Sequence, residues 1–153
     1  CALPICAAVE SAIHQMRGVL LDVPGAKALW DGLRDQTHKF FCDAHEMNAG
    51  QTLWRLSLPA IAASVTADQL PGAGHQLIEW GGGQRWLWSD TGGDAVRAVA
   101  RKLGGHAVRF NNQHVDGETF EQPSAALMAI HRRLKQSFDP HGIFNPGRLY
   151  QGL

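Results

Sequence analysis

The stretch EWGGGQRWLW, residues 79–88, gathers side chains that can bind a carboxylate. It places Glu79, Gln84 and Arg85 beside two tryptophans in the chain. An arginine can stack on an indole or bind a carboxylate through two parallel hydrogen bonds, and a hydrogen-bonded glutamate can hold its orientation. A packed hairpin in which Glu79 and Arg85 pair across the strands explains the same residues equally well. A protein interface is a third interpretation, because Trp and Arg are favoured interface anchors.

Other patterns of catalytic chemistry are weak in this sequence. The glycine runs at 81–83, 92–93 and 104–105 match neither a Walker loop nor a dinucleotide fingerprint, so they are predicted to serve turns and caps. His106, His114 and Asp116 lie near one another in sequence, but a zinc site needs three or four converging ligands, and we expect no metal. No GxSxG motif presents a nucleophilic serine.

The segment FDPHGIFNPGRLY, residues 138–150, combines two Xaa-Pro steps with two glycines. A proline disfavours the α region for the residue before it, so Asp139 is predicted to end a helix. By the same rule Asn145 is predicted to be extended, with its amide free for a partner. Arg148 and Tyr150 are predicted to continue as an edge strand. A helix cap needs only the first half of this segment, and the second half therefore predicts a docking partner.

The composition is that of one globular domain, with 153 residues, 44% hydrophobic and 18% charged. Fourteen basic and fourteen acidic side chains give no net charge, which argues against nucleic acid as a partner. Three unevenly spaced cysteines predict reduced thiols and a cytoplasmic location. No stretch approaches the ~20 apolar residues of a membrane span. Because the chain begins with Cys rather than Met, we expect a fragment or processed product of a longer protein.

Hydrophobic periodicity predicts the elements that position these residues. The first predicted helix is broken near its start by Pro4 and is followed by strand or loop material. Residues 60–74 suit either a short helix or a loop. The predicted helices cover residues 1–18, 26–41, 91–105 and 124–138. The predicted strands cover residues 52–59, 75–80, 85–90 and 106–110, with a turn at the three glycines of 81–83.

Apolar side chains at helical spacing predict the buried face of each helix. Ser124 is the expected cap of the last helix, and Asp94 or Thr91 that of the helix before it. The predicted buried positions are Leu29, Leu33, Thr37 and Phe40 or Phe41 in helix 26–41, Ala95, Val96, Val99 and Leu103 in helix 91–105, and Leu127, Ile130, Leu134 and Phe138 in helix 124–138.

The order of these elements predicts a ferredoxin-like α+β fold. Two strand-helix-strand pieces surround an antiparallel hairpin, which places helices on one face of an antiparallel sheet and leaves a C-terminal helix and extended tail. Trp54, Trp80, Trp86 and Trp88 fall on few strands. We therefore expect the other face of the sheet to be covered rather than solvated.

Several of these stretches together resemble a known family. Residues 138–150 resemble the signature D-P-x-x-x-x-N-P-G-[RK] of FAD-linked oxidases of the vanillyl-alcohol oxidase type. Five further stretches resemble the C-terminal half of the FAD-binding subunits of glycolate oxidases. They are LPICAA, LRDQTHKFF, LWRLSLP, EWGGGQRWLW and LGGHAVRF. The resemblance spans nearly the whole chain. It departs between Val9 and Lys27, where the family pattern implies a strand and a helix, and in lacking the histidine motifs of related 2-hydroxyacid dehydrogenases.

The resemblance implies a split architecture. In this family an N-terminal PCMH-type domain binds FAD, the C-terminal cap is ferredoxin-like, and the last segment returns to the flavin domain. Residues 1–122 would then form the cap (substrate) domain, and 123–153 the helix and tail that return to the FAD-binding domain. FAD is expected in the full-length protein and not on this chain alone. The residues expected to face the flavin domain are Asn145, Pro146, Gly147, Arg148 and Tyr150.

The implied function is a contribution to the oxidation of a small 2-hydroxy acid to a 2-oxo acid within a multisubunit complex. Arg85 or Arg109 would bind the substrate carboxylate, with Glu79 nearby, and His106 and His114 are the available general bases. The implied partners are the FAD-binding domain of the same subunit, a second flavoprotein subunit and an iron–sulfur subunit, with a peripheral association to the inner membrane through the complex.

Two other functions fit the residues. One is a non-catalytic interaction domain that packs on partner subunits through its tryptophan-rich sheet. The other is a ferredoxin-like sensor of small molecules that needs no flavin.

Overall fold

The computed structural model describes residues 3–42, 50–110 and 118–153. The chain folds as two compact units, Cys1–Asp43 and Ala44–Leu153. Across the described residues, no helix is both long and apolar enough to cross a membrane.

The first unit contains α1 (Leu3–Gln15), α2 (Val23–Arg34) and the short α3 (Lys39–Cys42), with no strand among its described residues. Helix α2 begins three residues before the predicted start. Asp22 accepts a hydrogen bond from the Gly25 N–H at 2.9 Å and so caps the helix, while Pro24 suits a first turn whose N–H groups have no helical partner. Cys42 is a free, exposed thiol.

The helix predicted over 26–41 is interrupted, which corrects that prediction. Gln36 adopts a left-handed conformation, with φ of 58°, just beyond the C-cap of α2. The Thr37 N–H donates to the Gly32 carbonyl at 2.9 Å, and the Gln36 N–H donates to the Leu33 carbonyl at 3.4 Å. This is the Schellman arrangement that closes a helix, so Thr37 does not extend the apolar stripe.

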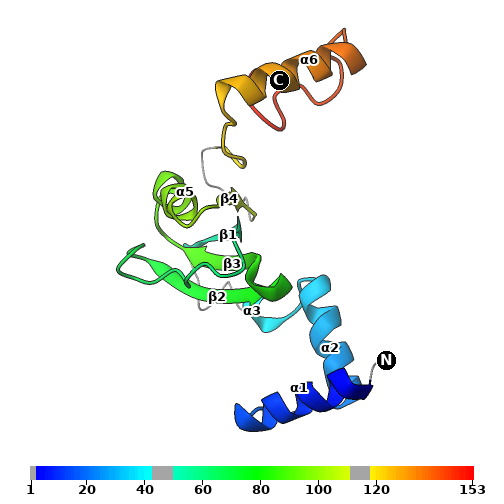
Figure 1. The fold of residues 1–153 in the computed structure, drawn as a ribbon. Helices are drawn as coiled ribbons and strands as arrows, with labels where there is room; N and C mark the ends of the chain where they lie inside the picture. Colours follow the sequence, from blue (N-terminus) through cyan, green and yellow to red (C-terminus); the bar gives the residue numbers. More distant parts are fainter. Residues whose placement is uncertain (1–2, 43–49, 111–117) are drawn as a thin grey trace. The chain divides into compact units, whose positions relative to one another are not determined.

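The second unit is built on a four-stranded antiparallel sheet (Figure 1). Its strands are β1 (Thr52–Ser57), β2 (Ala73–Glu79), β3 (Gln84–Ser89) and β4 (His106–Arg109), in the order β2-β3-β1-β4. This is the order of a ferredoxin-like sheet, and it confirms the α+β prediction. Helix α5 (Gly93–Lys102) connects β3 to β4, and α6 (Ala125–Phe138) follows.

A loop rather than a helix makes the crossover from β1 to β2. This crossover loop, residues 58–72, buries Leu58, Val65 and Leu70 as part of the core. The Gln76 side-chain amide donates to the Val65 carbonyl at 2.5 Å and fixes the loop against β2. The loop therefore supplies the apolar layer that a second helix supplies in a complete ferredoxin-like unit.

Both faces of the sheet carry buried side chains. Residues directly opposite in antiparallel strands share a face, so Trp54 and Leu87 lie together with Val96 and Ala100 of α5. Leu53, Trp86 and Trp88 lie on the other face. These three are also buried, as expected from the tryptophan content of the strands.

Trp80 is an exception to that expectation. It lies in the turn η1 (Trp80–Gly82) rather than in a strand, has a φ of 53°, and is 80% exposed.

The two long helices of this unit differ from the sequence prediction in detail. Gly92 is the N-cap of α5 and no side chain caps it, so neither Asp94 nor Thr91 has the expected role. Ser124 does cap α6, accepting from the Leu127 N–H at 3.3 Å.

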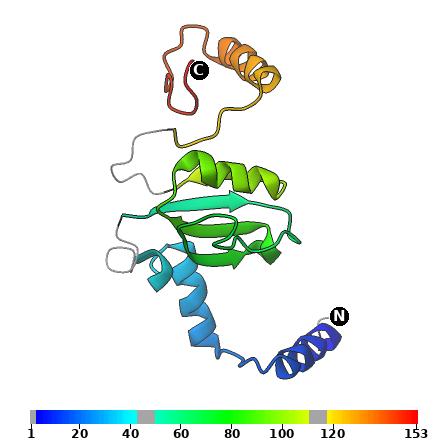
Figure 2. The same ribbon diagram turned by 90° about the vertical axis from the view of Figure 1, so that its left-hand side faces the viewer.

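The burial predicted for α6 is wrong. Its expected core residues are exposed and Met128 is buried instead, while the tail turns back alongside the helix (Figure 2). The exposed residues are Leu127, Ile130, Leu134 and Phe138.

Candidate functional site

In the hairpin of β2 and β3, the polar side chains do not form the predicted Glu79–Arg85 ion pair. Glu79 lies opposite Gln84. Its Oε1 accepts a hydrogen bond from the Trp86 indole N–H at 2.8 Å and a second from the Gln84 amide. No Glu79–Arg85 pair forms, because the register places Arg85 opposite Ile78 instead. Glu79 thus serves to hold the indole of Trp86.

Arg85 is 3% exposed and points toward the crossover loop. Its Nε donates to the Gly82 carbonyl at 3.2 Å, its Nη1 to the Ala63 carbonyl at 2.6 Å and its Nη2 to the Ala62 carbonyl. A guanidinium has five N–H donors, and three of them are used here to fix the loop on the sheet. A substrate carboxylate at Arg85 would compete with these contacts.

Arg109 belongs to a different cluster, which sequence reasoning did not assemble. The guanidinium carbons of Arg97 on α5 and Arg109 on β4 lie over the ring of Trp54, at 5.5 and 5.4 Å from its centroid. Both arginines are buried, at 9% and 6% exposed. Burial lowers the pKa of the Arg109 guanidinium, and the charge of Arg97 lowers it further.

His106 lies apart from this cluster. His106 is exposed and stands three residues from Arg109 on β4, so the two side chains point to opposite faces of the sheet. His114 lies outside the described residues. Among the described residues, no group of three or more His, Cys, Asp or Glu side chains is placed to hold a metal ion. The structure therefore does not gather Glu79, Arg85, Arg109 and His106 into one site.

Asp139 organises the junction between α6 and the tail. It is buried, and its carboxylate accepts the N–H groups of Ile143 at 3.0 Å and Phe144 at 2.9 Å. The Lys135 ammonium lies 2.9 Å from the same carboxylate and also donates to the Phe144 carbonyl. The hydrogen bond from Lys135, followed by the two backbone N–H groups, lowers the pKa of Asp139 to about 2.

We expect the pKa of Asp139 to be visible in the amides that it binds. The Ile143 and Phe144 amide shifts in an NMR titration should move with a midpoint near pH 2 rather than near the ordinary 3.8. The pKa of Asp139 is lower in the folded chain than in the unfolded chain. The carboxylate therefore stabilises the folded state above pH 3.8, and this stabilisation is lost as the pH falls toward 2.

Two variants control this titration. Asp139→Asn should abolish it, and Lys135→Met should move the midpoint upward. A wild-type midpoint near 3.8 would contradict the arrangement.

The second half of the tail forms a turn, which corrects the prediction of an extended Asn145 and an edge strand. Asn145 has φ of 45° and Gly147 has φ of 69°, and the Arg148 N–H donates to the Asn145 carbonyl at 3.2 Å. Asparagine and glycine tolerate these left-handed conformations, and a Pro-Gly pair suits the centre of a tight turn. No strand occurs in the described residues after Arg109.

Tyr150 packs its ring instead of extending a sheet. Its ring centroid lies 5.6 Å from that of His131 on α6 and 6.3 Å from that of Phe120, both edge-on. The Gly147 N–H donates to the Leu153 carbonyl at 2.6 Å and closes the end of the tail.

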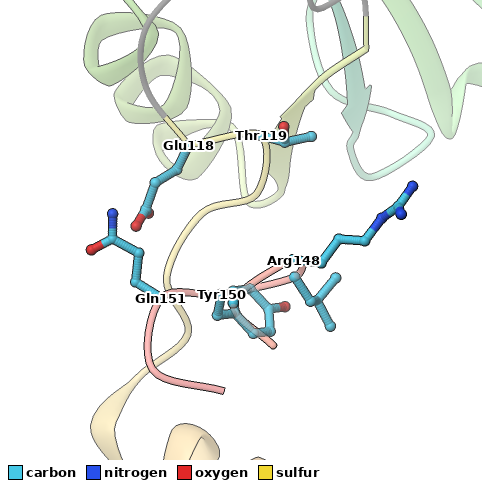
Figure 3. A pocket seen from close by; sticks show the side chains of 7 residues that line it. Glu118, Thr119, Arg148, Tyr150 and Gln151 are labelled. Atoms are coloured by element: carbon cyan, nitrogen blue, oxygen red, sulfur yellow. The ribbon is translucent and has the colours of Figure 1, made fainter. Parts of the chain in front are cut away.

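Two open cavities of about 350 and 640 Å³ lie between this turn and residues 118–120. Figure 3 shows Glu118 and Gln151 facing one another on one side of the smaller cavity, with Arg148 extending on the other side. Arg148 lines both cavities. Of the residues predicted to face a flavin domain, those that line a cavity are Asn145, Gly147, Arg148 and Tyr150.

The α6 helix and the tail together expose a large apolar surface. On α6 the exposed stripe lies beside a second stripe, in which Met128 is buried, His131 contacts Tyr150 and Lys135 holds the tail. The tail therefore packs along one stripe and leaves the other uncovered. We call the uncovered set the apolar docking surface; its members are Leu127, Ile130, Leu134, Phe138, Ile143, Phe144 and Leu149.

Arg97 is the main residue that the sequence analysis missed. The signal was present, because Val96 and Ala100 are four residues apart and Arg97 lies next to the stripe that they define. An arginine is normally expected on the exposed face of such a helix, so this position alone did not predict that Arg97 is buried.

Two comparisons relate the chain to known proteins. Residues 94–149 match the family model of the C-terminal domain of FAD-linked oxidases. The chain is 41% identical over 144 residues to the glycolate oxidase subunit GlcE of Escherichia coli strain K12. The aligned residues cover 94% of this chain and 37% of that protein. It thus spans less than half the length of this relative. No solved structure matches the chain.

Proposed function

Because the chain belongs to the FAD-linked oxidases, we propose that it is the C-terminal cap part of a flavin-dependent glycolate oxidase subunit. In this proposal it contributes to the oxidation of a small 2-hydroxy acid to a 2-oxo acid. The flavin, bound mainly by the rest of the subunit, supplies the hydride acceptor. The residues of this chain bind the substrate and close the site over it.

The apolar docking surface is the observation that carries this proposal. Seven large apolar side chains are exposed on one helix and its tail, and exposed apolar patches of this kind mark interaction sites. We assign this surface to the FAD-binding domain of the same subunit. The match covers only 37% of GlcE, so that relative has a long remaining segment that can supply such a domain.

The tail supports the same assignment. Asn145, Pro146, Gly147 and Arg148 are exposed, and Tyr150 is half-buried. The turn presents its backbone and the Arg148 guanidinium outward, which suits contact with a second domain. We accordingly propose residues 1–122 as the cap and residues 123–153 as the helix and tail that dock on the flavin domain.

Among the substrate-binding predictions, the geometry speaks against Arg85, because its guanidinium donates to three carbonyls of the fold. Arg109, which lies over the ring of Trp54 beside Arg97, stays a prediction. Roles for Glu79, His106 and His114 in substrate binding stay predictions. So do the partner subunits, a second flavoprotein and an iron–sulfur protein, and the association with the inner membrane through them.

Exposed Trp80 favours the second candidate function, an interaction domain without catalytic residues. An indole 80% exposed at the tip of a hairpin is a typical anchor for a partner protein. Replacement by serine separates the two functions in the assembled complex. Lost assembly at unchanged FAD content would support the interaction domain.

Flavin retention by the full-length subunit tests the leading proposal. We expect Leu134→Gln combined with Phe138→Ser to weaken docking of α6, because each removes apolar surface that contributes about 2 kcal/mol when buried. The FAD-to-protein absorbance ratio after gel filtration should fall at least several-fold. Arg133→Gln, on an exposed position of the same helix, should leave the ratio unchanged. Full FAD content in the folded double variant would refute the docking surface.

A further inference from the structure

A row of polar side chains crosses one face of the sheet in the second unit. Residues directly opposite one another in antiparallel strands share a face, with Cβ atoms about 5 Å apart. From β2 through β3 and β1 to β4, the residues that lie opposite one another are Glu79, Gln84, Ser57 and His106. We call these four the polar row. His106 is exposed and Ser57 is half-buried, so solvent reaches this part of the sheet face.

Arg55 adjoins the middle of the polar row. It lies two residues before Ser57 on the inner strand β1, so the two side chains point to the same face. Its other neighbours on this face are hydrophobic, namely Leu53 on the same strand and Trp86 and Val108 directly opposite on β3 and β4. The polar surroundings of its guanidinium on this face therefore lie toward the polar row.

Arg55 has no partner for its guanidinium in the part of the chain that the structure describes. The side chain is half-buried, and its Nε is fully buried without a hydrogen-bond acceptor. The two other arginines of the described strands are used by the fold, since Arg85 donates to three carbonyls and Arg109 lies over the ring of Trp54. A buried N–H without an acceptor costs free energy, and such a group is commonly satisfied by a ligand or by water. The guanidinium of Arg55 is therefore available to a ligand.

The acidic end of the polar row is already engaged. Glu79 accepts the Trp86 indole N–H at 2.8 Å and the amide of its neighbour in the row, and these bonds fix its carboxylate on the β2 side of the sheet. Because β3 separates β2 from β1, Glu79 lies about 10 Å from the strand of Arg55 and does not pair with it. At the other end, the side chains of Ser57 and His106 make no hydrogen bond to any described residue. An anion therefore fits this second half of the row.

We propose that Arg55, Ser57 and His106 form a binding site for a small carboxylate on this face of the sheet. A planar guanidinium matches a carboxylate through two parallel hydrogen bonds, and hydrophobic neighbours strengthen such a pair by lowering the local dielectric constant. The Ser57 hydroxyl and the His106 ring can each donate or accept a hydrogen bond, which suits a hydroxyl next to the carboxylate. The choice of a 2-hydroxy acid rests on the proposed function, whereas the carboxylate site rests on the unpaired Arg55.

The test measures ligand binding on the full 153-residue chain and needs no flavin. Glycolate is titrated while the arginine Nε–H and histidine ring signals are followed by NMR, with acetate and chloride as comparison anions. We expect saturable glycolate binding that shifts the signals of Arg55 and His106. Acetate should bind at the same place several-fold more weakly, because it lacks the hydroxyl. Absence of saturable binding by the folded chain, or binding that leaves the Arg55 signal unmoved, would overturn the proposal.

Four variants locate the site. Arg55→Gln should weaken glycolate binding at least about tenfold while the urea midpoint of unfolding stays unchanged, since the guanidinium has no partner in the fold. Arg55→Lys should keep part of the binding, because the charge remains and the two parallel hydrogen bonds are lost. Ser57→Ala should weaken the binding of glycolate but not that of acetate. Arg101→Gln is the control, because Arg101 is exposed and paired with Glu121. An equal loss with Arg101→Gln would show unspecific attraction and refute the site.

This test and the flavin-retention test fail independently. Glycolate binding by the chain stands if the α6 variant keeps its FAD, and flavin loss from the α6 variant stands if the chain binds no carboxylate. In the full-length subunit, Arg55→Gln should raise the KM for the hydroxy acid at unchanged FAD content. An unchanged KM would overturn the assignment of the site to the substrate.

Discussion

Replacing Gly105 with alanine is expected to lower the free energy of unfolding by at least about 3 kcal/mol. A Cβ atom at this position would lie 1.9 Å from the Ser57 carbonyl oxygen and 2.9 Å from the Ser57 carbonyl carbon. These are backbone atoms of β1, and the next residue, His106, begins the pairing of β4 with β1 opposite Ser57. The clash can be relieved only by separating the two strands.

A matched glycine provides the control. Gly83 follows η1 with φ of −75°, and a Cβ there would meet its nearest neighbour, the Trp80 carbonyl oxygen, at an ordinary 3.4 Å. Gly83→Ala should therefore stay within about 1 kcal/mol of the wild type. Urea unfolding followed by circular dichroism measures both variants. Equal stability of the two variants would contradict the close approach at Gly105.

Arg85→Ala is expected to have the second largest effect, a loss of about 2–3 kcal/mol of stability. The variant removes the side chain that ties the Ala62, Ala63 and Gly82 carbonyls together. The crossover loop should then separate from the sheet, which hydrogen exchange of its amides would detect. Arg101→Ala, at an exposed site, is the control and should change stability by less than about 0.5 kcal/mol.

The same variant separates a structural role of Arg85 from a substrate role. In the full-length subunit, the KM for the hydroxy acid is measured on the folded fraction below the unfolding transition. An unchanged KM is expected if the guanidinium serves only the loop. A KM raised tenfold or more in folded protein would return Arg85 to the substrate site.

The sheet could be predicted well because its signals are local. The alternation in residues 52–59 and the glycines between two alternating stretches set β1 and the β2–β3 hairpin, and Ser124 marked the start of α6. The crossover loop could not be assigned, because its alanines favour a helix while Pro59 and Pro71 do not. Tertiary contacts decide such a segment, and here the contact is with Arg85 and Gln76.

The predicted sites depended on contacts distant in sequence. Periodicity identified the stripe of Leu127 and Leu134 on α6, but it could not say whether the present chain covers that stripe. Glu79 and Arg85 are close in sequence, yet the register placed each opposite a different partner. Arg97 and Arg109 are twelve residues apart, and they meet only because α5 leads the chain into β4, which pairs with β1. The local sequence between them does not predict this pairing.

The junction at Asp139 bears on how the tail would meet another domain. Its contacts with Lys135, Ile143 and Phe144 span at most five residues, so the helix end and the tail hold their shape through local bonds. Such a segment does not have to be ordered at the moment of contact, and the entropy cost of ordering a side chain or loop on binding is largely avoided. The last residues can thus hold their binding conformation before any partner is present.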